Sequence, residues 1–391
     1  MGKAFAPGHH PGDRRWSVAL SQFSTRPTSS FSLSTLYKEL KILVGSSVAE
    51  QNGKPILNAL RGTAVEPRPV WLMRQAGRYL PEYLALRSKA SDFMTLCLTP
   101  ELATEVTLQP IKRFGFDAAI LFADILLVPH ALGQRVWFEQ GEGPKLEPLT
   151  DDIRKNFAKH SSMSALAPVY ETIARTRAKL PPSTTLIGFA GAPWTVATYM
   201  IAGGSSDDST PARLFALRDP KAFSALIETL IEATATYLIA QVEAGAEALQ
   251  LFESWAGTIP AAKIDTYSVN PLRRIITKVR ERAPNTPIVV FPRGAGANYG
   301  AYAHIGAAAI SIDAHTPLTW VRGQAGNATL QGNLDPLALI AGSGALTAAI
   351  DQILDDTRGT PHIFNLGHGI RPETPIAHVE QMLAHIRARR S

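Results

Sequence analysis

The stretch TLIGFAGAPWTVATYM, residues 185–200, decides the fold class. It begins as an almost continuous apolar run, passes through a Gly-Ala-Pro turn and continues as a segment of helical character. Apolar strands that lack alternation are buried on both faces, which is typical of parallel sheets covered by helices. The stretch therefore predicts a strand at 185–191, followed by a helix that carries Tyr199.

Similar apolar runs recur from about residue 54 to the end of the chain. They are PVWLM at 69–73, AAILFADI at 118–125, ALQLFES at 248–254, IVVFPRG at 288–294, AAISID at 308–313, ATLQGNLD at 328–335 and HIFNLGHG at 362–369. Helical patterns separate them, among them 222–245, 336–359 and 372–390. Eight strands alternating with helices predict an α/β fold, a single (β/α)8 TIM-type barrel. A doubly wound open sheet is the second choice.

Composition restricts the class of partner. The chain has 391 residues, and its 39 Lys and Arg against 33 Asp and Glu give a net charge of +6. The only tight basic cluster is terminal, so nucleic acid is not expected as a partner, whereas an anionic small molecule stays open. A single cysteine, Cys97, excludes an intramolecular disulfide framework and a multi-thiolate metal site, and it favours a reducing, cytosol-like compartment.

Residues 1–50 differ from the rest of the chain. They are rich in Ser, Thr and Arg and show no sustained periodicity. We interpret them as an irregular N-terminal extension, either a disordered tail or the product of a mis-assigned start codon, and a transit peptide stays open. Residues 54–391 are predicted to form one barrel domain. The uncharged run 180–206 is interrupted by Pro and Gly, so no membrane span is predicted.

Polar side chains follow the predicted strands at their carboxyl ends. They are Arg74, Asp124, Ser254, Arg293, Asp313, Asn333, Asp335 and His368. In (β/α)8 barrels the active site lies at this end of the strands. The sequence therefore predicts that polar groups from many strands meet at the rim of one pocket.

Arg74 and Arg78 are permanently charged, and their planar guanidinium groups match carboxylate or phosphate. The structural alternative is a salt bridge, for example between Arg78 and Glu82. Asp124 lies within an apolar run, where an unpaired carboxylate costs several kcal/mol. It is interpreted as a fixed negative charge that faces a cationic or N–H-rich ligand, with an ion pair or a turn cap as the alternative.

Tyr199, Ser254 and His368 each have a common structural explanation beside the functional one. Tyr199 could be a core residue of its helix, Ser254 could cap a turn, and the Gly-His-Gly around His368 could be a phosphate-binding loop. Asp313, Asp335 and His368 could also hold a metal ion. No predicted strand ends in lysine and no Gly-x-Gly-x-x-Gly follows one, which argues against Schiff-base, pyridoxal phosphate and dinucleotide chemistry.

Several long segments resemble known sequence motifs. PVWLMRQAGRYLPEY and GFAGAPWTVATYM are similar to the two signature segments of the uroporphyrinogen decarboxylase family. FADILLVPHALG, LQLFESWAG, TLQGNLDP and FNLGHGI resemble further blocks of that family in the same order. The resemblance extends from about residue 54 to the C-terminus.

The resemblance implies a carbon–carbon lyase without metal or cofactor, acting as a cytoplasmic homodimer, although import into an organelle stays open. Such an enzyme removes four acetate carboxyl groups from uroporphyrinogen III to give coproporphyrinogen III in haem and chlorophyll synthesis. The implied catalytic residues are Asp124 and Arg74, and the implied substrate-binding residues are Arg74, Gln75, Ala76, Gly77, Arg78, Asp124, Tyr199, Ser254 and His368. A related barrel methyltransferase and a non-enzymatic tetrapyrrole-binding protein are the alternatives.

Overall fold

The computed structural model describes residues 53–139, 143–150, 155, 157 and 163–389. The expectations for residues 1–50 fall outside these ranges. Statements about the structure below refer to the described residues.

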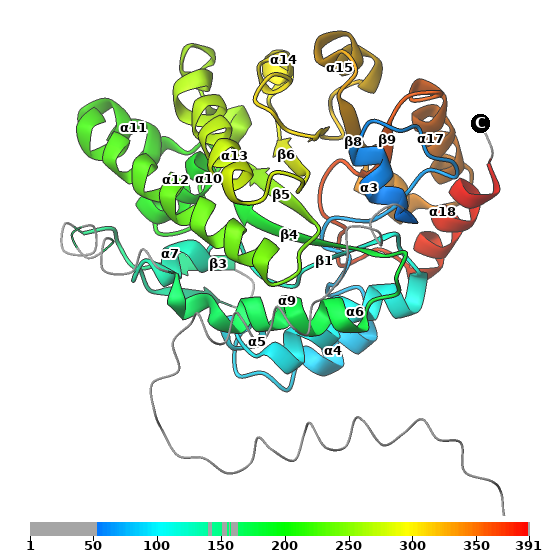
Figure 1. The fold of residues 1–391 in the computed structure, drawn as a ribbon, viewed down its shortest axis with the longest axis horizontal. Helices are drawn as coiled ribbons and strands as arrows, with labels where there is room; N and C mark the ends of the chain where they lie inside the picture. The colour runs from blue at the N-terminus through cyan, green and yellow to red at the C-terminus, as the bar shows by residue number, and fades with distance from the viewer. Residues whose placement is uncertain (1–52, 140–142, 151–154, 156, 158–162, 390–391) are drawn as a thin grey trace, which may run out of the picture. The chain divides into compact units, whose positions relative to one another are not determined.

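A curled parallel sheet lies at the centre of the described chain (Figure 1). Seven described strands form it in the order β1-β4-β5-β6-β7-β8-β9. Their bounds are Ala118–Ile120 for β1, Thr185–Gly191 for β4, Ala248–Glu253 for β5, Ile288–Pro292 for β6, Ala309–Ser311 for β7, Thr329–Leu334 for β8 and His362–Leu366 for β9. The parallel α/β architecture is thus confirmed. A doubly wound order is wrong, because each strand pairs with the next one along the chain.

The first predicted strand, 69–73, is reduced to a single bridge between Val70 and Phe364 of β9. The Phe364 N–H donates to Pro69 O (2.9 Å), and the Asp117 N–H, just before β1, donates to Val70 O (2.9 Å). Residues 69–71 therefore join the two edge strands of the sheet. Pairing ends after Trp71 because side chains take the next amides: Leu72 N–H donates to Gln75 Oε1 and Met73 N–H to Asn365 Oδ1.

Helices surround the sheet and most begin with proline in the first turn, where a missing N–H leaves no intrahelical bond unmade. In the first half of the chain they are α3 Pro55–Leu60, α4 Pro81–Arg87, α5 Phe93–Cys97, α6 Pro100–Phe114, α7 Leu127–Ala131, α9 Ala167–Lys179 and α10 Pro193–Ala202. In the second half they are α11 Thr210–Arg218, α12 Pro220–Glu243, α13 Asn270–Arg282, α14 Tyr299–Tyr302, α15 Leu318–Ala325, α16 Pro336–Ala341, α17 Ser343–Asp356 and α18 Ile376–Ala388.

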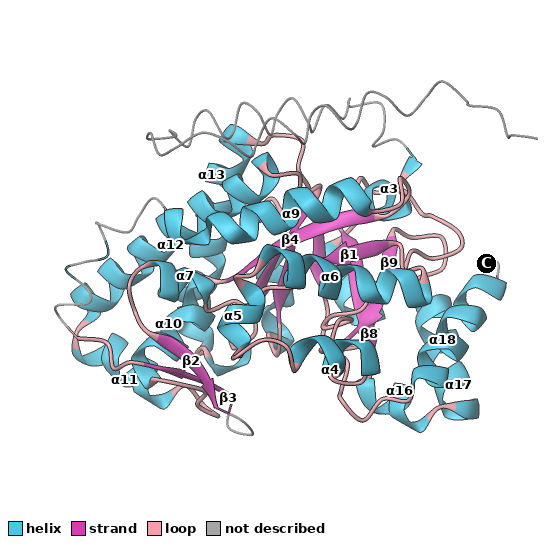
Figure 2. Cartoon of the chain, turned by 90° about the horizontal axis from the view of Figure 1, so that it is seen from below, coloured by secondary structure: helices cyan, strands magenta, loops and turns pink. Residues whose placement is uncertain are grey.

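Two predicted helices differ from the structure. The segment 336–359 is broken into α16 and α17 at Gly342, whose φ of +67° is left-handed and ends the first helix. The last helix begins at Ile376, after Pro375, rather than near 372. A short antiparallel hairpin, β2 Val136–Glu139 and β3 Gly143–Leu146, was not anticipated and lies apart from the main sheet (Figure 2).

Helix α12 is long and apolar enough to cross a membrane by length and composition, but 56% of the relevant window is buried inside the protein. It packs on α13, α10 and β4. This packing is that of a core helix.

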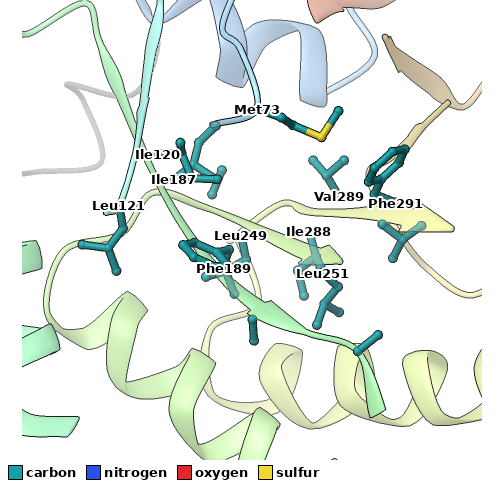
Figure 3. Packing of buried hydrophobic residues seen from close by; sticks show 14 of the residues in the cluster. Met73, Ile120, Leu121, Ile187, Phe189, Leu249, Leu251, Ile288, Val289 and Phe291 are labelled. Atoms are coloured by element: carbon teal, nitrogen blue, oxygen red, sulfur yellow. The ribbon is translucent and has the colours of Figure 1, made fainter. Parts of the chain in front are cut away.

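The apolar core includes side chains from neighbouring strands, such as Ile120, Ile187 and Val289 (Figure 3). The strand register pairs Phe189 with Gln250 and Phe252 with Phe291, and paired residues of a parallel sheet share a face. The rings of Phe189, Phe252 and Phe291 form a row, with centroids 5.5 Å and 6.2 Å apart. This aromatic row lies one step below the carboxyl end of the strands.

Candidate active site

The register places Ser254 and Arg293 together at the carboxyl edge of the sheet. Phe252 is the partner of Phe291, and the next side chains on the same face are those of Ser254 and Arg293. Both residues are half-buried. Asp124 lies in the loop that follows β1, and β1 ends at the same carboxyl edge of the sheet.

Asp124 has one oxygen committed and the other available. Its Oδ1 accepts a hydrogen bond from the Leu126 N–H (2.8 Å), so the predicted turn cap is present. No cation within the described residues forms a salt bridge with it. Burial raises the pKa of the carboxyl to about 6, against the opposing effects of the Leu126 N–H and the charge of Arg74. The group is therefore largely ionised at pH 7, and the alternative of an internal ion pair is wrong.

Arg74 reaches the site from the loop after residues 69–73. Its φ is +61°, a left-handed backbone conformation that residues other than glycine seldom adopt and that costs about 1–3 kcal/mol. Its side chain crosses Gly369, and a Cβ at that glycine would lie 2.4 Å from Arg74 Cδ. The positive charge of Arg74 lowers the pKa values of both Asp124 and His368.

Arg78 is exposed and forms no ion pair with the described residues. The expected alternative, a salt bridge to Glu82, is wrong. Glu82 instead forms a bidentate pair with Arg113 of α6, at 2.6 Å and 2.9 Å. Arg78 therefore has its guanidinium group available for an external anion.

Gln75, Ala76 and Gly77 connect the two arginines. Gln75 is buried, and its amide oxygen accepts from Leu72 N while its Nε2 donates to Ala118 O (3.0 Å). The main chain thus uses both ends of the Gln75 side-chain amide, and the substrate-binding role expected for this residue stays a prediction. Ala76 and Gly77 are half-buried, and a Cβ at Gly77 would lie 3.1 Å from Arg74 O.

Tyr199 lies on α10 and packs edge-on against Trp255, with ring centroids 6.3 Å apart. Burial raises the Tyr199 pKa, as does the nearby charge of Asp124, whereas Trp255, Arg74 and Arg293 lower it. The loop with Ser254 and Trp255 is tied to α10, because Thr195 Oγ1 accepts from Trp255 N (3.2 Å) and Trp194 Nε1 donates to Trp255 O (3.2 Å).

His368 is held neutral at pH 7. Burial, together with the positive charges of Arg74 and Arg293, lowers the pKa of its imidazole to about 4. The ring therefore offers a neutral hydrogen-bonding group rather than an acidic proton.

The remaining carboxylates considered as metal ligands are engaged elsewhere. Asp313 is buried and accepts hydrogen bonds from Gly294 N, Tyr299 OH, His315 N and Thr316 Oγ1, at 2.6–3.1 Å. Asp335 caps α16 through Leu337 N (2.8 Å). The suggestion that these two residues and His368 hold a metal is wrong, because no group of three possible ligands lies together in the part of the chain described by the structure.

Arg293 and Trp255 are two further neighbours of the site: the sequence placed Arg293 at a strand end without assigning it a role, and it did not indicate Trp255. Arg293 acts electrostatically on both Tyr199 and His368, and Trp255 contacts Tyr199. The signal for Arg293 was its place at the end of a strand, equivalent to that of Ser254. Trp255 gave no such signal.

Comparison with known proteins agrees with this arrangement. The family model "Uroporphyrinogen decarboxylase (URO-D)" matches residues 51–389. The uroporphyrinogen decarboxylase of Chelativorans sp. (strain BNC1) is 51% identical over 335 residues, which cover 85% of this chain and 98% of that protein. That of Sphingopyxis alaskensis is 52% identical over 337 residues, covering 85% and 98%.

A solved structure, a methyltransferase from Methanosarcina mazei, superposes with a TM-score of 0.67 at 19% identity and covers 85% of this chain and 97% of its own. That likeness concerns the fold alone. Together, the family match, the identity of about half over most of the chain and the arginine–aspartate site show that the chain belongs to the uroporphyrinogen decarboxylase family.

Proposed function

We propose that this protein is a carboxy-lyase that converts uroporphyrinogen III to coproporphyrinogen III and CO2, using Asp124 and the arginines around it. The observation that carries the proposal is the state of Asp124. Its carboxylate is half-buried, has no paired cation and has one oxygen without a partner among the described residues. Arg74 and Arg78 lie in the loop after residues 69–73, and neither arginine forms an ion pair with a carboxylate of the described residues.

We further propose that residues 54–391 form one (β/α)8 barrel. The hydrogen bonds of residues 69–71 to β9 and to Asp117 favour an eighth, very short strand that closes the sheet. Closure would bring the carboxyl ends of all strands around one site. The expected homodimer and the independence from cofactors rest on the family resemblance, and the proposed cytoplasmic location rests on the single cysteine.

The charge distribution of the substrate matches that of the site. A porphyrinogen with eight acidic arms has anions at its periphery and pyrrole N–H groups at its centre. We assign the N–H groups to Asp124 and peripheral carboxylates to Arg74 and Arg78. Ser254, Tyr199 and the neutral His368 are assigned hydrogen bonds to the bound substrate.

The reaction requires a sink for the electrons left by CO2. A proton added to a pyrrole carbon gives a ring cation conjugated with the acetate arm, the bond to the carboxylate breaks, and CO2 leaves. Loss of the ring proton and addition of a proton to the exocyclic carbon give a methyl group, so each cycle consumes one proton and releases one CO2. The porphyrinogen itself thus supplies the sink that other enzymes obtain from a cofactor.

Asp124 stabilises this transient cation. A charge pair about 4 Å apart at an effective dielectric constant near 20 contributes roughly 4 kcal/mol, or about three decades in rate. Arg74 is our candidate for passing a proton to the ring carbon, with replacement from water, although a pKa above about 12 makes it a weak acid. The neutral state of His368 disfavours an imidazolium as the donor.

The test is incubation of the pure full-length protein with uroporphyrinogen under anaerobic conditions. We expect CO2 and coproporphyrinogen to form without added metal or cofactor. Binding without CO2 release would favour the tetrapyrrole carrier. Methyl transfer to a thiol acceptor in place of decarboxylation would favour the methyltransferase.

A further inference from the structure

We infer that Arg293 is a third substrate-binding arginine, one that binds a peripheral carboxylate from the side of the site opposite Arg74. The inference rests on the proposed function and adds a specificity-determining residue to it. The resemblance to known motifs did not select this residue.

Placement is the first support. Arg293 follows β6, and the register of β5 and β6 sets it beside Ser254 and above the aromatic row of Phe252 and Phe291. Arg293 is half-buried at the end of this apolar face. A cation in such surroundings is costly unless an anion accompanies it.

The absence of an internal partner is the second support. The Arg293 side chain forms no hydrogen bond or ion pair with the described residues, unlike Arg113 or Arg274, which have bidentate carboxylate partners. Arg293 is therefore free to bind an external carboxylate.

The main chain holds Arg293 in place. Its N–H donates to Glu253 O (3.1 Å), and its carbonyl accepts from Gly257 N (3.1 Å). Gly257 and Gly294 lie so close that a Cβ on Gly257 would be 2.9 Å from Gly294 O, and Gly294 has a φ of +76°. Only glycine can occupy both positions in this close contact of the two main chains. The loops after β5 and β6 therefore fix the position of the Arg293 main chain.

Arg293 and Arg74 approach the same groups from opposite sides. Both lower the pKa of His368 and that of Tyr199. From residues 69–71 the sheet order runs through β1, β4 and β5 to β6 in one direction, and through β9, β8 and β7 to β6 in the other, four steps each way. A macrocycle with carboxylates on its whole periphery needs cations on more than one side, and Arg293 supplies the second.

The bound carboxylate belongs either to an acetate or to a propionate arm, and product binding separates the two. Coproporphyrinogen keeps the propionates and has lost the acetates. We propose to prepare full-length Arg293→Ala, Arg293→Gln and Arg293→Lys, with Arg274→Ala as the control, since Arg274 lies on the outer helix α13 and pairs with Glu228. KM and kcat for anaerobic uroporphyrinogen and the Kd of anaerobic coproporphyrinogen are measured for each.

We expect KM of Arg293→Ala to rise about ten- to one-hundred-fold, the equivalent of one charged hydrogen bond, with kcat changed by less than about threefold. The lysine variant recovers part of the loss because it keeps the charge, and the control keeps the wild-type KM. A matching rise in the coproporphyrinogen Kd assigns Arg293 to a propionate, whereas an unchanged Kd assigns it to an acetate. The acid limb of His368 in the pH profile also moves to higher pH in the alanine variant.

A KM of Arg293→Ala within about twofold of wild type, with unchanged product binding, overturns the inference while leaving the decarboxylase proposal intact. Failure of the wild-type protein to release CO2 overturns the proposed function instead. If the alanine variant does not fold, the glutamine variant, which keeps most of the stem without the charge, gives the same comparison.

Discussion

Arg74 lies directly across Gly369, and a single methyl group at position 369 would fall 2.4 Å from Arg74 Cδ and 2.9 Å from its Nε. The loop after β9 and the loop after residues 69–73 are thus fitted to each other at the site. The hydrogen bond from Ile370 N to Met73 O (2.9 Å) fixes the same two loops through their main chains. Glycine is required at 369 because Arg74 occupies the space of a side chain.

Gly369→Ala should therefore displace Arg74 and lower kcat/KM by about a hundredfold, since a shift of about 1 Å in a positioning group costs this much. The control is Gly344→Ala in α17, where an added Cβ meets nothing within 4 Å. That exchange should leave activity unchanged and stabilise the helix by about 0.5–1 kcal/mol. Equal activity of the two variants in steady-state assays would contradict the role given to this contact.

Asp124→Asn should make the protein more stable at pH 7 than wild type. The pKa of the folded state is raised to about 6 from 3.8, so the folded state binds more protons between these values and stability falls as pH rises through this window. Removal of the charge should raise the free energy of unfolding by up to about 3 kcal/mol above pH 6 and by almost nothing below pH 4. Urea unfolding at pH 7.5 and pH 4 measures the difference. A destabilised variant at pH 7.5 would mean that the carboxylate has a structural partner.

Arg78→Ala should raise KM about ten- to one-hundred-fold with little change in kcat, because the lost interaction forms equally in the ground state and the transition state. Lys112→Ala is the matched control, since Lys112 forms only an exposed ion pair with Glu105. An unchanged KM in steady-state kinetics would rule out Arg78 as a carboxylate-binding group.

A buried ion pair supports the opposite end of the sheet. Lys54 Nζ lies 2.6 Å from Glu247 Oε2 and donates to Thr184 O (2.8 Å), and both charged residues are almost inaccessible to solvent. Lys54→Met should lower the free energy of unfolding by less than the about 3–5 kcal/mol that an unpaired buried charge costs, because Arg177 stays 3.4 Å from Glu247 Oε1 and the Leu186 N–H still donates to Glu247 Oε2. Adding Glu247→Gln should lower the free energy of unfolding further in urea unfolding, because Arg177 then loses its carboxylate partner as well. Activity per folded molecule should be unchanged in both variants, and a fall in kcat would contradict the separation of this pair from the site.

The sequence predicted the strand ends well, because buried parallel strands leave apolar runs and their polar ends mark one edge. Ser254 and Arg293 follow this rule through the register of β5 and β6, and Asp124 follows it through its place in the loop after β1. The first strand was predicted too long, since nothing local reveals that the side chains of Gln75 and Asn365 take the amides of Leu72 and Met73.

Pairings formed by tertiary packing were also beyond the sequence. The spacing of Arg78 and Glu82 suggested a local salt bridge, but α6 brings Arg113 to Glu82. Gln75 lies between two site arginines in the sequence, yet it is buried between main-chain groups. Adjacency in the chain therefore identified the site loop but not the orientation of each side chain in it.

The measurement that tests the central claim most directly is the anaerobic turnover of Asp124→Asn. If an ionised carboxylate lies beneath the macrocycle, its loss in this variant should lower kcat by about a thousandfold. The limb near pH 6 in the wild-type pH–rate profile should also disappear. Turnover near the wild-type rate, with the variant folded at pH 7.5, would contradict the account.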